Sequence, residues 1–238
     1  MKRTVIVTDM RSPEAREAAA YLTDNEYEVI FVPREISLCD GETLRNFAEA
    51  HAEHLWGVIH PAPGMILGGI EEVTEEDWNR ASQEGALASM SVTRVFGKVM
   101  QKNGYGSLIY LNSIHAEKPV GKGMLFSMSC AATQMICREA AQYYGQDGLR
   151  FFFVQRGITA TDPDARSDVS QVYFAPDLRR ADRKMPTEGD LNGLIAFLLT
   201  PEAACLNGSD LRADGGMTLY YVHRRKVEGR EYFDPRKK

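Results

Sequence analysis

The sequence predicts an α/β protein built on a doubly wound, parallel sheet of about seven strands with helices on both faces. Short β-branched, apolar runs alternate with helical segments along its 238 residues, and such alternation is typical of a parallel sheet. Residues 151–154 are apolar without alternation, which indicates a strand buried on both faces. The length suits one large domain. We therefore expect a single domain at residues 1–219 and an extension at residues 220–238.

The individual elements follow from local patterns. Strand segments are rich in Val, Ile and Phe, and glycines mark several of their ends. We expect strands at residues 4–8, 27–32, 57–60, 107–111, 151–154 and 210–213. We expect helices at residues 13–24, 42–54, 75–103, 127–144 and 188–199. The apolar positions of the 75–103 segment follow the helical period only loosely. Residues 159–187 form a long polar segment, which predicts a lid.

Composition and charge exclude several classes of protein. The net charge of −5 disfavours a general nucleic-acid surface. No apolar run approaches the ~20 residues of a membrane helix, and the first residues lack the cleavage site of a signal peptide. The four cysteines stand at no metal-ligand spacing with one another or with histidine. We expect free thiols, no metal site, no membrane or nucleic-acid partner, and a cytoplasmic protein.

Three motifs, in matching order and spacing, resemble the short-chain dehydrogenase/reductase family. Residues 185–216 run through a Pro-Glu helix start, a small loop and a strand that ends in Asp214-Gly215-Gly216. Residues 157–161 resemble the family's P-G-x-x-x-T, with Arg156 in place of the proline. The strand at 107–111 and the following Asn112-Ser113 resemble the strand that carries the catalytic serine. The resemblance covers essentially the whole chain and implies a Rossmann-like fold.

The resemblance also implies a catalytic Ser, Tyr, Lys and Asn, and most of these are missing. Ser113 is present, but Phe126 stands at the Tyr position and Cys130 at the Lys position. The Asn position falls on Gly85. A phenyl ring cannot transfer a proton, and a thiol carries no positive charge. We therefore expect these four positions to be vestigial.

The cofactor motif of the family is degenerate as well. The family's glycine-rich turn lets the backbone approach a diphosphate, but residues 8–16 contain no glycine. The corresponding positions include Asp9, Arg11, Pro13 and Ala15. Asp9 and Glu14 would bring negative charge toward the diphosphate.

The family motif that flanks the adenosine falls on residues 60–64, where only Ala62 and Gly64 match it. Pro61 and Pro63 in the same segment have no backbone N–H to donate. Asp40 matches an acidic position near the adenine, and Arg34 is either a surface arginine or a ligand for a 2′-phosphate. We predict no cofactor in this chain.

Other residues could still form a site. Ser113 and His115, or Cys130 and His115, could pair as nucleophile and base in a relocated, cofactor-free site. A further alternative is a small-molecule sensor that uses the old substrate cleft beneath the expected lid.

The leading hypothesis is a non-catalytic subunit, because a preserved scaffold accompanies a doubly lost site. Its partner would be an active member of the same family that carries NAD(P), joined as a dimer or tetramer through the helices at 75–103 and 127–144. The resemblance implies an alcohol or hydroxyacyl-CoA dehydrogenase, as in the two-subunit enzymes of benzylsuccinate breakdown. No residue identifies the substrate.

Overall fold

The computed structural model describes residues 2–119, 121–159, 184 and 186–219. The expected extension at 220–238 lies outside the described residues, and so does most of the expected lid at 159–187. Within the described ranges, no helix is long and apolar enough to cross a membrane.

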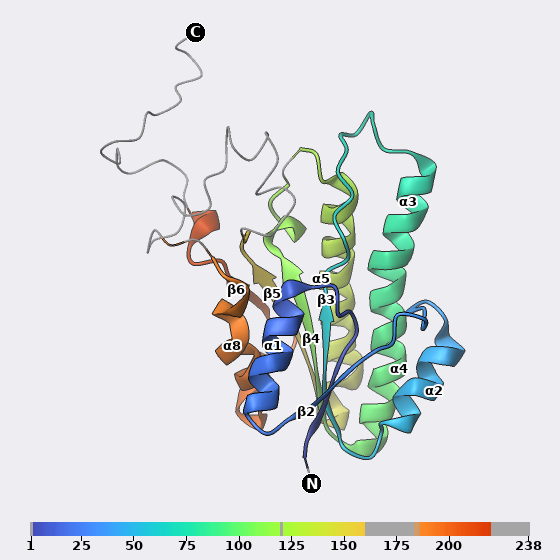
Figure 1. Cartoon of the computed structure of the whole chain (residues 1–238), viewed down its shortest axis with the longest axis vertical. Coiled ribbons are helices and arrows are strands. Elements are labelled where there is room, and N and C mark those ends of the chain that lie inside the picture. Colours follow the sequence, from blue (N-terminus) through green and yellow to red (C-terminus); the bar gives the residue numbers. More distant parts are fainter. Residues whose placement is uncertain (1, 120, 160–183, 185, 220–238) are drawn as a thin grey trace.

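A parallel sheet of six strands forms the centre of the described structure, close to the predicted seven (Figure 1). Its order is β2-β1-β3-β4-β5-β6, and every neighbouring pair is parallel. The strands are β1 (Thr4–Val7), β2 (Glu28–Phe31), β3 (Leu55–Pro61), β4 (Gly106–Ser113), β5 (Leu149–Arg156) and β6 (Asp210–Ala213). The three central strands β3, β4 and β5 are almost wholly buried, as the unbroken apolar run at 151–154 predicts.

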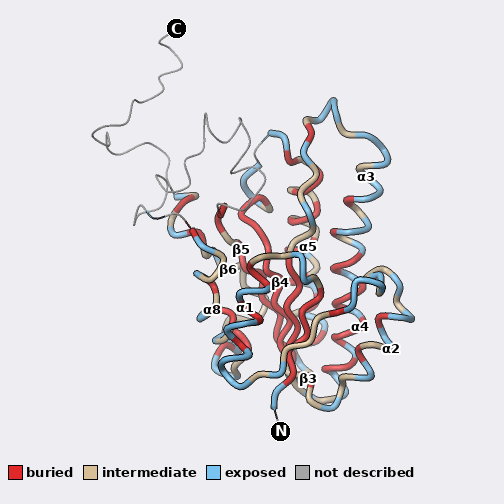
Figure 2. The backbone as a smooth tube through the Cα atoms, in the orientation of Figure 1, coloured by how far each residue is buried: buried red, intermediate tan, exposed pale blue. Residues whose placement is uncertain are grey.

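Helices cover both faces of the sheet, as expected for a doubly wound fold. On one face lie α1 (Pro13–Asp24) and α8 (Asn192–Leu198), whose apolar side chains join one core cluster. On the other face lie α2 (Gly41–Ala50), α4 (Ala88–Asn103) and α5 (Met124–Tyr144), which share a second cluster. Figure 2 shows the buried strands between these two layers.

Two predicted helices begin differently in the structure. The helix expected at 127–144 begins one turn earlier, at Met124. The helix expected at 188–199 opens with a 3₁₀ turn, Glu188–Leu191, before α8. A Thr187–Asp190 capping box lies at the start of that turn and satisfies backbone donors there. The helix predicted at 13–24 has the observed bounds, with Ser12 as its N-cap.

The single helix predicted at 75–103 is wrong in one respect, because a π-helical turn divides it. The segment consists of α3 (Glu75–Ser82), the π turn Gln83–Leu87 and α4. A π turn adds a residue to the local repeat, which explains why the apolar positions keep helical spacing only loosely.

Gly85 lies buried in the π turn, where it allows close contact with α5. A β-carbon at this position would lie 2.4 Å from Ser129 Oγ and 2.5 Å from Ser129 Cβ. The Ser129 hydroxyl donates a hydrogen bond to the Ala81 carbonyl across the same contact, at 3.1 Å. The glycine at the expected Asn position therefore has a packing role.

The order of the strands creates a crevice between β1 and β3. From β1 the chain builds outward to β2, whereas β3 begins the other half of the sheet. Ligands of open α/β sheets bind outside the carboxyl ends of the strands at such a switch point. Thr8 and the turn after it, and residues His60 to Gly64, lie at this point.

Replacing Gly85 by Ala should reduce the free energy of unfolding by about 1–3 kcal/mol, because over-packing forces α4 and α5 apart. Urea unfolding monitored by circular dichroism measures the change. Gly193→Ala is the matched control, since nothing lies within 4 Å of a β-carbon there. A loss in Gly85→Ala no larger than in the control would contradict the proposed contact.

Candidate functional site

Two adjoining cavities occupy the crevice at the carboxyl ends of the strands. The outer cavity has a volume of about 410 Å³ and lies between the turn after β1, the loop after β2, the end of β3 and the π turn. The inner cavity has a volume of about 310 Å³ and reaches toward β4, α5 and β5. Asp9, Arg11, Ala62 and Pro63 line both. The crevice is therefore one continuous candidate site.

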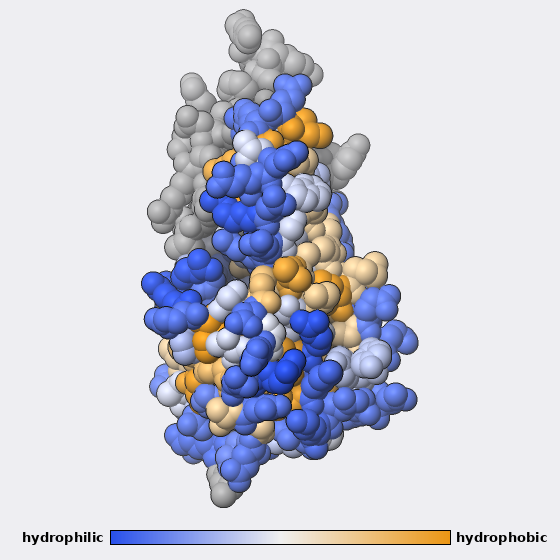
Figure 3. Space-filling model, turned by 90° about the vertical axis from the view of Figure 1, so that its right-hand side faces the viewer, coloured by the Kyte–Doolittle hydropathy of each residue, from blue (hydrophilic) through white to orange (hydrophobic). Residues whose placement is uncertain are grey.

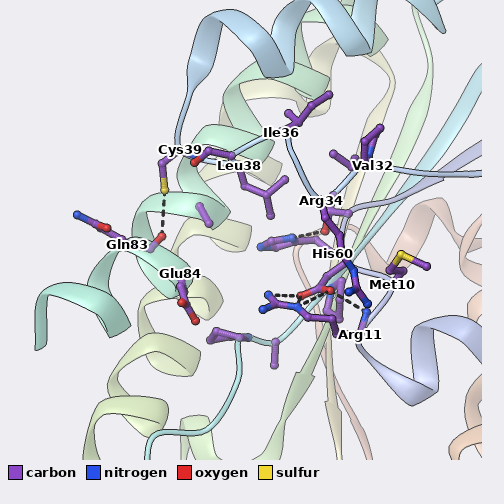
Figure 4. A pocket seen from close by; sticks show the side chains of 18 residues that line it. Met10, Arg11, Val32, Arg34, Ile36, Leu38, Cys39, His60, Gln83 and Glu84 are labelled. Atoms are coloured by element: carbon purple, nitrogen blue, oxygen red, sulfur yellow. Dashed lines mark hydrogen bonds and ion pairs between the residues drawn. The ribbon is translucent and has the colours of Figure 1, made fainter. Parts of the chain in front are cut away.

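The outer cavity combines apolar walls with a polar floor (Figure 4). Val32, Ile36 and Leu38 line one side, and the side chain of His60 lies at the base. The Cys39 thiol closes part of the rim by donating to the Gln83 carbonyl at 3.1 Å.

His60 anchors a buried chain of hydrogen bonds behind the outer cavity. Its Nδ1 hydrogen-bonds with Thr8 Oγ1 at 2.7 Å, and its Nε2 with Ser89 Oγ at 3.1 Å. Ser89 Oγ in turn hydrogen-bonds with Thr133 Oγ1 at 2.8 Å. This series of hydrogen bonds joins the end of β1 to β3, α4 and α5. Burial lowers the pKa of His60 to about 4, against a smaller opposing effect of Asp9, so the imidazole is neutral at physiological pH.

Two backbone N–H groups of the turn after β1 donate to side chains of the same turn. The N–H of Arg11 donates to Asp9 Oδ1 at 2.8 Å, and the N–H of Ala15 donates to Ser12 Oγ at 3.2 Å. Pro13 has no N–H. Burial raises the pKa of Asp9, but the hydrogen bonds and charge of Arg11 outweigh it and hold that pKa below its usual value. Asp9 and Arg11 therefore form an ion pair at 2.7 Å.

Glu14 and Arg156 meet at the start of α1, beside the inner cavity. Glu14 Oε1 lies 3.1 Å from Arg156 Nε, and their side chains are 5% and 14% exposed. Glu14 Oε2 accepts a hydrogen bond from Ser12 Oγ at 2.9 Å. A dinucleotide, which the family resemblance implies, would bring a diphosphate to this helix N-terminus. The residues present do not fit it, because a buried carboxylate already lies there and the N–H groups of Arg11 and Ala15 are engaged within the protein.

The structure brings most of the predicted catalytic positions together. Ser113 at the end of β4, His115 just after it, and Phe126 and Cys130 on α5 are all buried. The ring centroids of His115 and Phe126 are 5.8 Å apart at 68°. Burial raises the pKa of the Cys130 thiol well above its usual range, against smaller effects of Arg156 and the Ser113 backbone, so the thiol stays neutral. Phe126 lines the inner cavity.

The hydrogen bonds do not form the relocated Ser113–His115 pair that a cofactor-free site requires. Ser113 Oγ accepts from the backbone N–H of His115 at 3.3 Å. The His115 ring directs Nδ1 to the Lys118 carbonyl at 2.8 Å. A nucleophile and its base need a direct side-chain hydrogen bond, and this geometry does not supply one.

The remaining predicted site residues have mixed placements. Ala62 and Gly64 line the cavities, and the Ala62 N–H donates to Leu111 O at 2.9 Å. Asp40 instead caps α2, with its carboxylate accepting from Glu42 N, Thr43 N and Thr43 Oγ1. Asp40 therefore has a capping role, and its interpretation as an adenine contact stays a prediction.

The sequence did not reveal the Glu14–Arg156 pair, because the two residues lie on elements far apart in the chain. Both deviate from the family pattern, Glu14 in the glycine-rich turn and Arg156 in place of a proline. The sequence did offer one signal for the pair: each of the two positions carries a charge where the family pattern has an uncharged residue, and the two charges have opposite sign. Among the described residues, no group of His, Cys, Asp or Glu could hold a metal ion.

Comparison with known proteins identifies the family. Residues 2–218 match the family profile described as Enoyl-(Acyl carrier protein) reductase. The chain belongs to the short-chain dehydrogenase/reductase family.

Individual relatives are distant. The chain is 22% identical over 232 residues to glucose 1-dehydrogenase 2 of Bacillus subtilis (strain 168), covering 92% of this chain and 86% of that one. It is similar to ElxO with NADP bound, at a TM-score of 0.81 and 18% identity, covering 92% and 100% of the two chains. A tyrosine-to-phenylalanine variant of ElxO with NADPH bound gives 0.80 and 19%, with the same coverage. These structural likenesses show the fold.

His60 should make stability depend on pH. Its pKa falls from an ordinary 6.5 to about 4 on folding, so the unfolded chain binds more protons between these values and stability is lost as pH falls. Between pH 7 and pH 4.5, the free energy of unfolding should fall by about 2 kcal/mol more in wild type than in His60→Gln. Urea unfolding across this range is the measurement. His54→Gln, at a partly exposed histidine, should keep the wild-type slope; equal slopes in all three proteins would contradict the buried neutral imidazole.

Proposed function

We propose that this chain is a non-catalytic subunit of a short-chain dehydrogenase/reductase oxidoreductase. In this proposal it pairs with a member of the family that retains the catalytic Tyr and Lys and binds NAD(P). The substrate class is an alcohol or hydroxyacyl thioester handled by the partner. A cytoplasmic location stays a prediction from the free thiols.

One observation carries the proposal: a buried phenyl ring and a buried neutral thiol occupy the positions of the family's proton donor and its cation. Phe126 is 6% exposed and Cys130 is fully buried. Neither side chain can exchange a proton with a carbonyl oxygen at neutral pH. Hydride transfer to a carbonyl without a proton source leaves an unstabilised alkoxide. Among the described residues, the side chains at these two positions therefore do not supply the group that completes the reaction.

The loss of the cofactor turn is independent of the loss of the tyrosine. The ElxO variant binds NADPH although a tyrosine of that protein is replaced by phenylalanine. A protein of this fold can therefore lose a tyrosine hydroxyl and still hold the dinucleotide. Here the Glu14–Arg156 pair and Pro13 add a second obstacle at a different point of the crevice, and this supports a subunit freed from both tasks.

The outer face of α4 and α5 supports the pairing. Met90, Met135 and Tyr143 are 41%, 52% and 71% exposed and line a shallow groove of about 570 Å³ between the two helices. Exposed methionines and aromatic side chains are enriched at interfaces. Arg94 and Glu139 on the same groove provide opposite charges for a partner face of the same family. Figure 3 shows a largely hydrophilic flank with hydrophobic residues gathered near mid-height.

The outer cavity favours a second candidate function, small-molecule binding without turnover. Its volume of about 410 Å³ falls within the range of ligand pockets, about 300–1,000 Å³. Its apolar wall and polar floor resemble a site that selects one ligand orientation. Binding of a small molecule in the absence of any partner would favour this reading.

The isolated chain should neither bind nor oxidise NADH. Titration to about millimolar NADH or NADPH should leave the melting temperature unchanged. A dinucleotide that bound with a Kd of about ten micromolar would then be at about 100 times its Kd and would stabilise the fold by about 2.7 kcal/mol, which would raise the melting temperature. Differential scanning fluorimetry measures binding. Absorbance at the nicotinamide band measures turnover, with a ketone or an oxoacyl thioester, the oxidised form of the proposed substrate class, as the hydride acceptor. ElxO, whose structure contains bound NADP, is the positive control for binding. Binding at tens of micromolar, or turnover without a partner, would refute the proposed function.

A charge on the α4–α5 face should abolish pairing. Met135→Glu places a carboxylate in the centre of the groove, where burial against a partner is costly. Co-expression with catalytically intact paralogues, followed by native mass spectrometry, should show a complex for wild type and its loss for Met135→Glu. Tyr21→Glu, on α1 at the opposite layer, should keep it. A complex that survives Met135→Glu would exclude this face.

A further inference from the structure

The buried series of hydrogen bonds behind the outer cavity has a definite direction, because it ends on a backbone carbonyl. The hydroxyl of Thr133 donates to the carbonyl of Ser129 at 2.9 Å. A hydroxyl carries one proton, so the 2.8 Å contact between Ser89 Oγ and Thr133 Oγ1 uses the proton of Ser89. Ser89 Oγ is then the acceptor in its 3.1 Å contact with His60 Nε2. The ring proton of His60 therefore lies on Nε2.

The same direction fixes the role of the Thr8 hydroxyl. Burial lowers the pKa of His60 to about 4, and a neutral imidazole has one donor and one acceptor nitrogen. With its proton on Nε2, the ring accepts at Nδ1, and Thr8 Oγ1 donates its one proton to that nitrogen at 2.7 Å. Thr8 is 4% exposed and lines the outer cavity. Toward the cavity, its oxygen therefore acts as an acceptor and has no proton to donate.

The charges that line the outer cavity balance one another. Among the described residues, they are two carboxylates and two guanidiniums, those of Asp9, Glu84, Arg11 and Arg34. Asp9 and Arg11 already form an ion pair at 2.7 Å. A charged ligand would lose its hydration on entering, and a wall without net charge does not offset that loss. The cavity therefore favours an uncharged ligand.

The remaining wall of the outer cavity is largely apolar. Val32, Ile36 and Leu38 line one side (Figure 4). Pro61 and Pro63 line it as well, and a proline has no backbone N–H to offer a ligand. Such a wall fits an apolar body, with a few polar groups left to fix its orientation.

We propose that the outer cavity binds an uncharged, largely apolar molecule with one hydrogen-bond donor, an alcohol, a phenol or an N–H heterocycle, and that this donor meets Thr8 Oγ1. A carbonyl or ether oxygen at the same place would set an acceptor against an acceptor, and both would lose a hydrogen bond that water supplies. The inference rests on the second candidate function, ligand binding without turnover, and names the ligand class.

The test compares two probes of nearly the same shape, indole with its N–H donor and benzofuran with a ring oxygen in its place. In isothermal titration calorimetry, wild type should bind indole at least about tenfold more tightly than benzofuran, which is about 1.4 kcal/mol. Thr8→Val should abolish this preference, and Thr8→Ser, which keeps the hydroxyl, should retain it. Ser37→Ala, which removes another hydroxyl from the lining of the same cavity, should behave as wild type.

A measurement on wild type tests the direction of the series without any variant. Nitrogen-15 NMR of the imidazole should show His60 protonated at Nε2. A proton on Nδ1 would reverse the series and overturn the role of Thr8, and so would a preference for indole that survives in Thr8→Val. Far-ultraviolet circular dichroism establishes that each variant is folded.

The remaining outcomes separate the inference from the proposed functions. Equal affinities of wild type for indole and benzofuran would overturn the selection of a donor and leave ligand binding in the cavity standing. Binding of neither probe would overturn the ligand class. Tight binding of NADH by wild type would instead refute the leading proposal of a non-catalytic subunit.

Discussion

The site depends on the parallel pairing of β1, β3, β4 and β5, because this pairing brings the carboxyl ends of four strands to one edge of the sheet. Asp9, His60, Ser113 and Arg156 each lie at or just after such an end, and the register sets Ser113 beside Arg156. The strands hold this register because they are buried on both faces between two apolar helix layers, where a shift of one residue would exchange the side chains of the two faces.

The residues at this edge differ from the family pattern, while the scaffold that carries them matches the family. Phe126 and Cys130 stand at the positions of the family's Tyr and Lys, and Glu14 stands in the turn that is glycine-rich in the family. Each replacement is compatible with folding: Phe126 and Cys130 pack as apolar side chains, and Glu14 is balanced by Arg156. A buried charge left without its partner is strongly destabilising, so the two charged replacements are coupled.

The same scaffold connects the crevice to the face proposed for pairing. The hydrogen bonds from Thr8 through His60 to Ser89 and Thr133 run from the cavity floor to the contact between α4 and α5. Gly85 permits the close approach of those helices at the π turn, which also forms a wall of the outer cavity. Polar networks that are fully satisfied fix one packing arrangement, and this one fixes the cavity and the helix pair together.

Local patterns in the sequence predicted the fold class, the bounds of α1 and β6, the family, and the absence of a tyrosine and a lysine at their expected positions. The patterns are the period of apolar residues, the N-cap Ser12 and the spacing of the motifs. The π turn at Gly85, the capping role of Asp40 and the pairing of Glu14 with Arg156 became visible only in the folded structure. Local sequence cannot specify these, since each depends on which distant atoms lie within a few ångströms once the strands have paired and the helices have packed.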